Sequence, residues 1–238
     1  MIRPFSSSLA LAALALPGTV LAQAYQCTVP QRIEPPRPVT PDGPAVRSAI
    51  GSYTLAVSWS PEYCRGDLAT RPGNAMQCSG RNGRFGFVLH GLWPEARSGP
   101  APQWCALSPR PKPETIRNSL CMTPLPWLLE HEWAKHGSCM AKSPEGYHRV
   151  AATLWRSLRW PNADDLSRDP ALTVGALRQA FVAANPGWRS DAVGVVTSRT
   201  GWLREFHLCY SRRFRPMPCR RGDFGPPDRA PLKIWRGL

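Results

Sequence analysis

The sequence predicts an α+β domain with a mainly antiparallel central sheet, flanked by helices and stapled by disulfides. Strand-like and helix-like segments do not alternate regularly along the chain, which argues against a parallel sheet. The chain has eight cysteines and no CxxC pair, which in an exported protein favours up to four disulfides over a metal site. No internal repeat divides the chain, so we expect one sizeable domain.

Residues 1–24 are typical of a signal peptide. Arg3 supplies the positive charge, an apolar run covers residues 9–16, and small residues at 20–24 offer a cleavage site. The apolar run is too short to span a bilayer. We therefore expect a protein without a membrane span that is exported to the periplasm or secreted.

Proline dominates the next segment, residues 25–52, in which residues 28–47 read TVPQRIEPPRPVTPDGPAVR. This composition predicts an extended N-terminal segment without helix or strand. Residues 53–238 are expected to form the single folded domain. Its arginine- and proline-rich tail after Cys219 is expected to pack loosely.

Two strands are predicted in the first half of this domain. YTLAVSW, residues 53–59, alternates like a half-buried strand. RFGFVLH, residues 84–90, repeats the alternation, so His90 would leave the end of the strand on the face opposite its aromatic residues. Gly91 would then turn the chain, and residues 96–113 would form a surface loop.

Three helices are predicted. The first covers residues 127–136 behind Pro126 and ends at a glycine. The second follows Ser143 as its N-cap, and the third lies within residues 172–187. Residues 205–219 favour a strand, a turn and a second strand.

The net charge of +14 at pH 7 is carried mostly by arginine. Arginine favours planar, bidentate contacts with phosphate. This balance suggests a polyanionic partner, such as nucleic acid, an anionic envelope surface or an acidic polysaccharide. Composition does not choose among the three.

The stretch LLEHEWAKHGSC, residues 128–139, first suggests zinc, because HExxH on a helix is a metal signature. Here the two histidines, His131 and His136, are five residues apart, which places them about 140° apart around a helix. They cannot hold one ion from one face. We therefore expect neither a metal nor another cofactor.

Glu132 shares a helix face with Lys135 and His136, three and four residues further on. A carboxylate, an ammonium and an imidazole so close together suit a site where a phosphate gains charge during a reaction. The charge of Glu132 would raise the pKa of His136. The alternative is an ordinary solvated helix, but Trp133 and Cys139 would anchor this helix to the fold.

His90, on a separate element, would complete the chemistry of RNA self-cleavage. One imidazole deprotonates the ribose 2′-hydroxyl, which attacks the adjacent phosphorus, and the other protonates the leaving 5′-oxygen. RNA carries its own nucleophile, so this reaction needs no metal.

Both histidine segments resemble the active-site segments of the ribonuclease T2 family. FVLHGLWP, residues 87–94, is similar to the first segment, and HEWAKHGSC, residues 131–139, to the second. SWSPEYC, residues 58–64, looks like the family's early strand, and FHLCYSRRFRPMPC, residues 206–219, like its late cysteine hairpin. The resemblance implies a ribonuclease T2-like fold over most of the mature chain.

The resemblance also implies roles for four catalytic residues. His136 would be the general base on the 2′-hydroxyl, and His90 would be the general acid on the leaving 5′-oxygen. Glu132 and Lys135 would stabilise the pentavalent phosphorane.

Three further residues would bind the substrate. His131 would contact phosphate, Trp93 would stack on a base upstream of the cut, and Glu95 would lie near the edge of that base. Core packing remains the alternative for Trp93. We interpret His148 and His207 as ordinary surface or core residues.

Four disulfides follow from the same resemblance, although eight cysteines allow 105 pairings on sequence alone. The implied bonds join Cys64 to Cys78, Cys105 to Cys139 and Cys209 to Cys219, which leaves Cys27 for Cys121.

The chain departs from the family at Leu128 and Leu129, where the family usually has Phe-Trp. Leu128 falls in the family's second base pocket, so the base preference stays open. The proline-rich N-terminal segment and the arginine-rich tail are not obvious family features either.

The sequence therefore predicts an exported, metal-independent, monomeric endoribonuclease. It would cleave single-stranded RNA through a 2′,3′-cyclic phosphate to 3′-phosphate ends, with low base specificity. One alternative is a basic, disulfide-rich protein that binds RNA or envelope polyanions without catalysis. A second alternative is metal-dependent hydrolysis.

Overall fold

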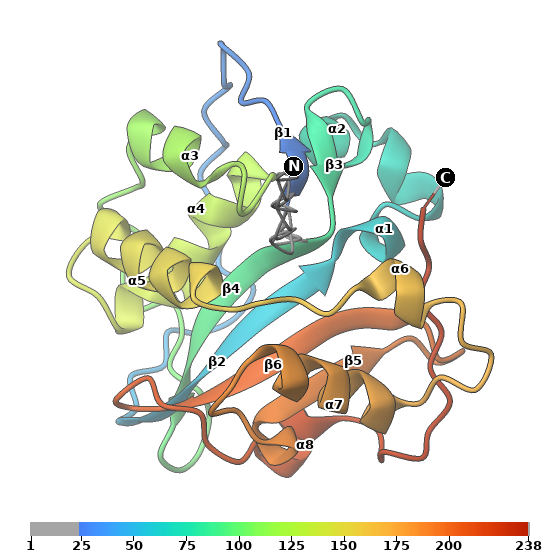
Figure 1. The fold of residues 1–238 in the computed structure, drawn as a ribbon. Coiled ribbons are helices and arrows are strands. Elements are labelled where there is room, and N and C mark those ends of the chain that lie inside the picture. The colour runs from blue at the N-terminus through green and yellow to red at the C-terminus, as the bar shows by residue number, and fades with distance from the viewer. Residues whose placement is uncertain (1–23, 238) are drawn as a thin grey trace, which may run out of the picture.

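The structure is a computed structural model that describes residues 24–237, so residues 1–23 of the predicted signal peptide lie outside the described residues. Its centre is a four-stranded antiparallel sheet in the order β4-β2-β6-β5 (Figure 1). These strands are β2 (Ile50–Trp59), β4 (Phe87–Ala96), β5 (Val193–Thr197) and β6 (Leu203–Ser211). A separate ribbon pairs β1 (Ala24–Cys27) with β3 (Gly83–Phe85). The predicted α+β class is confirmed.

Three longer helices flank the sheet: α4 (Pro126–Lys135), α5 (Pro144–Arg156) and α7 (Val174–Ala184). The hydroxyl of Ser143 accepts a hydrogen bond from the Gly146 amide, as predicted for the N-cap of α5. Thr173 caps α7 in the same way. Such caps satisfy amide groups that have no partner inside the helix, so they fix where a helix begins. α5 and α7 lie over one face of the sheet, and α4 packs beside β4 (Figure 1).

Shorter helical turns connect these elements. They are α1 (Ser60–Tyr63), α2 (Ala75–Cys78), α3 (Pro113–Ser119), α6 (Ala163–Leu166) and α8 (Arg221–Phe224), with 3₁₀ turns at Gly66–Thr70, Pro72–Asn74, Gly137–Cys139 and Ser190–Ala192. Between β4 and α3 the chain forms the predicted loop without helix or strand. None of the helices in the described part of the chain is long and apolar enough to cross a membrane.

The core lies between the sheet and the helices α5 and α7. Phe87, Trp160, Phe181 and Phe206 form an aromatic cluster whose contacting rings have centroids between 5.0 and 5.7 Å apart. Burial of such large rings is among the strongest contributions to folding. The central strands are therefore firmly held.

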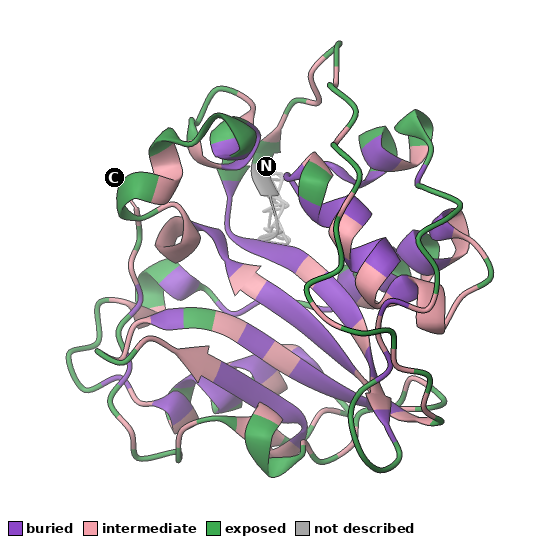
Figure 2. Cartoon of the chain, turned by 180° about the vertical axis from the view of Figure 1, so that it is seen from behind, coloured by how far each residue is buried: buried purple, intermediate pink, exposed green. Residues whose placement is uncertain are grey.

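The alternation of β2 predicted a strand buried on one face, but β2 is buried on both faces. Leu55 and Val57 face the core, yet Thr54 and Ala56 on the opposite face are only 1% and 0% exposed. Trp93 pairs with Thr54 across the strands and so lies on this second face. Figure 2 views the molecule from behind and shows these strands as largely buried.

A bulge, and not a turn, shapes β4 at His90. The pairing with β2 shifts register between Ala56 and Val57, which leaves His90 without a partner on β2. β4 runs on past Gly91, so the predicted turn there is wrong, and the predicted strand 84–90 is divided at Gly86 between β3 and β4. A bulge bends its strand and re-aims a side chain, which is how His90 is directed into the site described below.

Two predictions about the C-terminal part are wrong. Residues 205–219 contain one strand, β6, and the return segment makes only an isolated bridge between Tyr210 and Pro216. Prolines in that segment lack the N–H groups that a second strand needs. The tail also packs firmly, because Leu232 and Ile234 are buried in the main core.

The proline-rich residues 28–47 contain no helix or strand, as predicted. Two guanidinium groups hold this segment to the domain: Arg117 donates to the carbonyl of Pro30 and Arg110 to that of Pro36. These bonds use carbonyl groups that an extended chain leaves free. The segment thus has a defined path over the domain.

Four disulfides join distant parts of the chain, in the pairing that the resemblance implied. They are Cys27–Cys121, Cys64–Cys78, Cys105–Cys139 and Cys209–Cys219. The bond between Cys105 and Cys139 connects the loop after β4 to the turn after α4. It therefore links the two chain segments that carry the predicted catalytic histidines.

Candidate active site

Polar side chains from three elements meet on the face of the sheet opposite α5 and α7. β4 supplies His90 and Trp93, α4 supplies Glu132, and β6 supplies Glu205 and His207. β4 and β6 are the two neighbours of β2 in the sheet, so their backbones are fixed relative to each other. Sites built on strands and helices hold their geometry more precisely than sites on loops.

His90 lies between two carboxylates. Its Nδ1 atom is 2.9 Å from Oε1 of Glu205, and its Nε2 atom is 3.5 Å from Oε1 of Glu132. The imidazole side chain is 30% exposed, so a substrate can still reach it. This arrangement favours the positively charged ring.

Glu132 is almost fully buried and is held by Trp93, whose indole Nε1 donates to Oε2 of the carboxylate at 2.8 Å. Gly91 makes room for this group. A Cβ atom at Gly91 would lie 1.9 Å from the same Oε2 atom, so no larger residue fits beside Glu132 without displacing it. The glycine of the HGLWP segment is thus explained by close approach and not by a turn.

The two carboxylates beside His90 have opposite environments. Burial raises the pKa of Glu132 to about 7. Burial also opposes ionisation of Glu205, but hydrogen bonds from His207, His90 and Ser58 hold the pKa of Glu205 far below its ordinary value. Burial would lower the pKa of His90, yet the bond to Glu205 and the charges of both carboxylates raise that pKa to about 9.

His136 follows the last residue of α4 and has the opposite character to His90. Its ring lies 5.6 Å from the Trp93 ring, whose edge contact with the His90 ring spans 5.2 Å. Burial lowers the pKa of His136 to about 3, with further lowering by the positive charges of Lys135, His131 and His90. The prediction that Glu132 raises this pKa is wrong, because the Glu132 carboxylate turns to His90 and Trp93.

The two predicted catalytic histidines are therefore present in complementary forms near neutral pH. His90 carries a proton to give, and His136 is neutral and can accept one. The Nδ1 atom of His136 has no hydrogen-bond partner in the described part of the chain. Separated pKa values of this kind are what assigns an acid and a base in a catalytic pair.

Lys135 makes an ion pair that the sequence did not predict. Its Nζ atom is 2.6 Å from Oδ2 of Asp42, a residue of the proline-rich segment. The other oxygen of Asp42 accepts a hydrogen bond from the Trp104 indole at 3.0 Å. The lysine bond lowers the pKa of Asp42. Lys135 thus already holds an anionic group at the site.

The three predicted substrate-binding residues are placed differently from one another. His131 contacts the edge of the Trp104 ring, with centroids 5.4 Å apart, and burial lowers its pKa. Trp93 lies in the middle of the site among three imidazole rings. Glu95 points to Arg220, 3.7 Å away, and not to the catalytic groups.

Sequence reasoning missed Glu205 and His207. His207 was interpreted as an ordinary residue, but its Nε2 atom is 3.1 Å from Oε2 of Glu205. The alternation of EFHLCY puts both on one face of β6, which is a signal the sequence does contain. Only the pairing of Ser58 with Glu205 and of Ala56 with His207 shows that this face meets His90.

A cavity of about 150 Å³ opens beside His90 and Glu205. Leu128 lines it, at the position where the resemblance placed part of a second base pocket. The remaining wall is mixed, with residues that include Ser58, Tyr63, Gln77, Thr123, Leu125 and Trp127. Its size and its position next to His90 suit one nucleobase.

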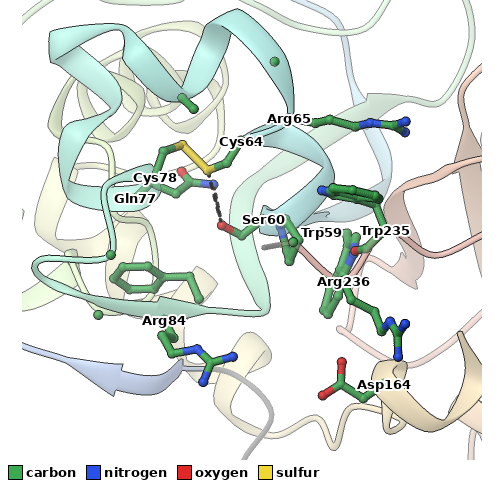
Figure 3. A pocket seen from close by; sticks show the side chains of 17 residues that line it. Trp59, Ser60, Cys64, Arg65, Gln77, Cys78, Arg84, Asp164, Trp235 and Arg236 are labelled. Carbon is green, nitrogen blue, oxygen red and sulfur yellow. Dashed lines mark hydrogen bonds between the residues drawn. A yellow bond between two sulfur atoms is a disulfide. The ribbon is translucent and has the colours of Figure 1, made fainter.

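A larger cavity of about 570 Å³ lies elsewhere, at the end of β2 (Figure 3). Arg65, Arg84 and Arg236 line it, and the Arg65 guanidinium stacks 4.7 Å above the Trp235 ring. None of the predicted catalytic residues borders it. We therefore place the active site at His90 and not at this cavity.

Among residues 24–237 no group of three or more histidine, cysteine, aspartate or glutamate side chains is arranged to hold a metal ion.

The fold is that of several solved ribonucleases. Trichomaglin, described as an S-like ribonuclease, has a TM-score of 0.56 at 21% identity, covering 72% of this chain and 92% of that chain. An RNase-related protein from Calystegia sepium has a TM-score of 0.58 at 20% identity, with 76% and 96% covered. At these identities the likeness shows the fold alone, which defines a structural class that includes these ribonucleases.

Sequence comparison identifies the family within that class. Residues 50–163 match the Ribonuclease T2 family. A ribonuclease of Aeromonas hydrophila is 33% identical over 165 residues, which are 67% of this chain and 71% of that protein. A probable ribonuclease of Haemophilus influenzae is 32% identical over 190 residues, covering 75% of this chain and 64% of that protein. The chain belongs to the ribonuclease T2 family and is an endoribonuclease.

Proposed function

We propose that this endoribonuclease is exported, needs no metal, and cleaves single-stranded RNA by attack of the ribose 2′-hydroxyl on the adjacent phosphorus. The products would be a 2′,3′-cyclic phosphate and a free 5′-hydroxyl, followed by hydrolysis of the cyclic phosphate to a 3′-phosphate. One observation carries the proposal: the rings of His90 and His136 both contact Trp93, and their pKa values are about 9 and about 3.

In the first step His136 accepts the proton of the 2′-hydroxyl, since it is neutral above about pH 3. The alkoxide oxygen bonds to phosphorus, and the bond to the leaving 5′-oxygen breaks. His90, charged below about pH 9, gives its proton to that oxygen. In the second step the roles reverse. His90, now neutral, takes a proton from water, whose oxygen bonds to phosphorus as the bond to the 2′-oxygen breaks, and His136 gives its proton to the 2′-oxygen.

Lys135 and Glu132 stabilise the pentavalent phosphorane that forms within each step. Lys135 supplies a fixed positive charge once it leaves Asp42 for the phosphate. Glu132, with its pKa raised to about 7, is protonated for part of the time at neutral pH and can then donate a hydrogen bond to a phosphorane oxygen. His131 lies near Lys135 and adds a further phosphate contact.

The cavity beside His90 takes the nucleobase on the leaving side of the cut. Leu128, Leu125 and Trp127 give it apolar walls, and contact with such walls discriminates little among bases. Trp93 is the stacking surface for the base on the other side. Low base specificity follows, with an affinity that falls as salt rises because of the +14 charge.

The test uses an RNA oligonucleotide and a copy with a single 2′-deoxy residue at the cut. We expect cleavage of the first only, unchanged by EDTA, with a cyclic phosphate that appears before the 3′-phosphate in mass spectra. Binding without cleavage of either oligonucleotide would support the polyanion-binding alternative. Loss of cleavage in EDTA would support metal-dependent hydrolysis.

Export is proposed on the strength of residues 1–24 and the four disulfides, which form in oxidising compartments. We place the mature enzyme in the periplasm or outside the cell, as a monomer. Fractionation of expressing cells with N-terminal sequencing of the product tests this. An intact N-terminus in the cytoplasmic fraction would contradict it.

A further inference from the structure

We propose that Glu205 is a positioning residue, which fixes the orientation of the His90 ring and preserves its positive charge for proton transfer. The inference rests on the proposed function of His90 as general acid. It concerns a residue of β6, outside both histidine segments and outside the region 50–163 that matches the family.

The Glu205 carboxylate is held by three partners, so it cannot rotate away from His90. Its Oε1 atom is 2.9 Å from Nδ1 of His90 and accepts a hydrogen bond from the Ser58 hydroxyl at 2.7 Å. Its Oε2 atom is 3.1 Å from Nε2 of His207. Three adjacent central strands therefore take part: β4 supplies the bulged histidine, β6 the carboxylate, and β2 the hydroxyl that holds the carboxylate.

This contact also decides which nitrogen of His90 faces the substrate. An ionised carboxylate can only accept hydrogen bonds, so the Nδ1 atom of His90 must carry a hydrogen. The Nε2 atom, directed toward Glu132 at 3.5 Å, is then the nitrogen that loses and regains the transferable proton. A fixed ring nitrogen of this kind is how a carboxylate partner tunes a catalytic or metal-binding histidine.

Charged groups reach His90 from every element around it. Glu132 comes from α4 and Glu205 from β6, and His131 and His136, whose pKa values burial lowers, lie on α4 and at its end. Glu132 is buried, which raises its pKa to about 7, so it ionises only near neutral pH. Glu205 has three hydrogen-bond partners and stays ionised in acid. Below pH 7 Glu205 is therefore the main negative charge beside His90.

The test compares Glu205→Gln with the wild-type enzyme across pH 5 to 9. Gln has nearly the same shape and loses only the charge, so we expect the pKa of His90 to fall by about 1 to 3 units. Cleavage should then change little at pH 5, where His90 is protonated in both enzymes, and fall by about twofold to about 90-fold at pH 8. Glu205→Asp keeps the charge and should recover part of the activity at pH 8.

The matched control is Glu62→Gln on α1, which removes one carboxylate that pairs with Arg65 and does not touch His90. It should leave the pH profile of cleavage unchanged. An NMR titration of His90 in the same variants supplies a readout that does not depend on activity. It separates this inference from the proposed function, because a protein that cleaves no RNA would still show the shifted His90 titration.

Two results would overturn the proposal. One is a His90 titration that is the same in Glu205→Gln and the wild type. The other is a loss of cleavage of equal size at pH 5 and pH 8 with normal thermal unfolding, which would indicate a role in something other than the charge of His90.

Discussion

At the scale of single residues, the site depends on two histidines that the protein holds in different protonation states. His90 is charged because two carboxylates flank it, and His136 is neutral because it is buried next to positive groups. The same side-chain type is therefore held in opposite protonation states at two positions 46 residues apart. What differs is only the surroundings that β4, β6 and α4 provide.

Replacement of either histidine by phenylalanine should nearly abolish cleavage while RNA binding survives. Phe keeps a planar ring but can neither give nor take a proton, and general acid or base catalysis contributes about 10² to 10⁴ in rate. Turnover and affinity for a single-stranded RNA should be measured separately for His90→Phe and His136→Phe. Rates near those of the wild type in either variant would contradict the assignment.

A second prediction at this scale concerns Gly91. Gly91→Ala would place a Cβ atom 1.9 Å from Oε2 of Glu132, so the carboxylate must leave the Trp93 indole. We expect turnover to fall up to about 100-fold, since a shift of about 1 Å in a catalytic group can cost that much.

Gly146→Ala is the control for Gly91→Ala, because its Cβ atom would meet only the Ser143 hydroxyl, at 3.4 Å. Circular dichroism should show both variants folded, with full turnover in Gly146→Ala. Full turnover in Gly91→Ala would mean that the position of Glu132 does not matter for the reaction.

At the scale of elements, the proline-rich segment has an unexpected part in the site. It has no helix or strand, yet Arg110 and Arg117 hold it in place and it brings Asp42 to Lys135. In the proposed mechanism RNA phosphate therefore competes with the Asp42 carboxylate for Lys135.

Asp42→Asn should bind RNA more tightly. Asn keeps an oxygen for the Trp104 indole but loses the charge that engages Lys135. We expect KM to fall about two- to fivefold, the range of a partly exposed ion pair, with kcat unchanged. Asp67→Asn, an exposed aspartate on a separate 3₁₀ turn, controls for the change in net charge. An equal effect in both variants would show that only net charge matters.

Elements whose signals are local could be predicted from the sequence, and contacts between elements could not. Ser143 marks the start of α5 because a cap acts on its own helix. Alternation along β6 places Glu205 and His207 on one face, but the contacts of Glu205 and Asp42 depend on strand pairing and on the path of the proline-rich segment. The bulge at His90 likewise depends on the register between β4 and β2. The alternation of residues alone predicted a strand that ended at His90.

At the scale of the whole molecule, buried titrating groups should make stability depend on pH with a maximum near pH 6.5. Burial lowers the pKa values of His136 and His148 to about 3 and about 4. Both groups therefore make the folded protein less stable as pH falls below 6.5. The pKa of His90 is raised to about 9, so its stabilising contribution is full below pH 6.5 and is lost as pH rises toward 9. The pKa of Glu132 is raised to about 7, so its stabilising contribution is full below about pH 4.5 and is lost as pH rises to about 7.

Between pH 4.5 and 6.5 each buried histidine with a lowered pKa makes the free energy of unfolding fall as the solution is acidified. The contribution of His148 alone should be about 1.4 kcal/mol per pH unit over this range. His148→Gln removes one of the two histidines at a buried position on α5, outside the active site. The slope of this variant between pH 4.5 and 6.5 should therefore be about 1.4 kcal/mol per pH unit smaller than that of the wild type. Urea unfolding of both proteins at several pH values measures the two slopes, and equal slopes would show that His148 is protonated to the same extent in the folded and unfolded chain.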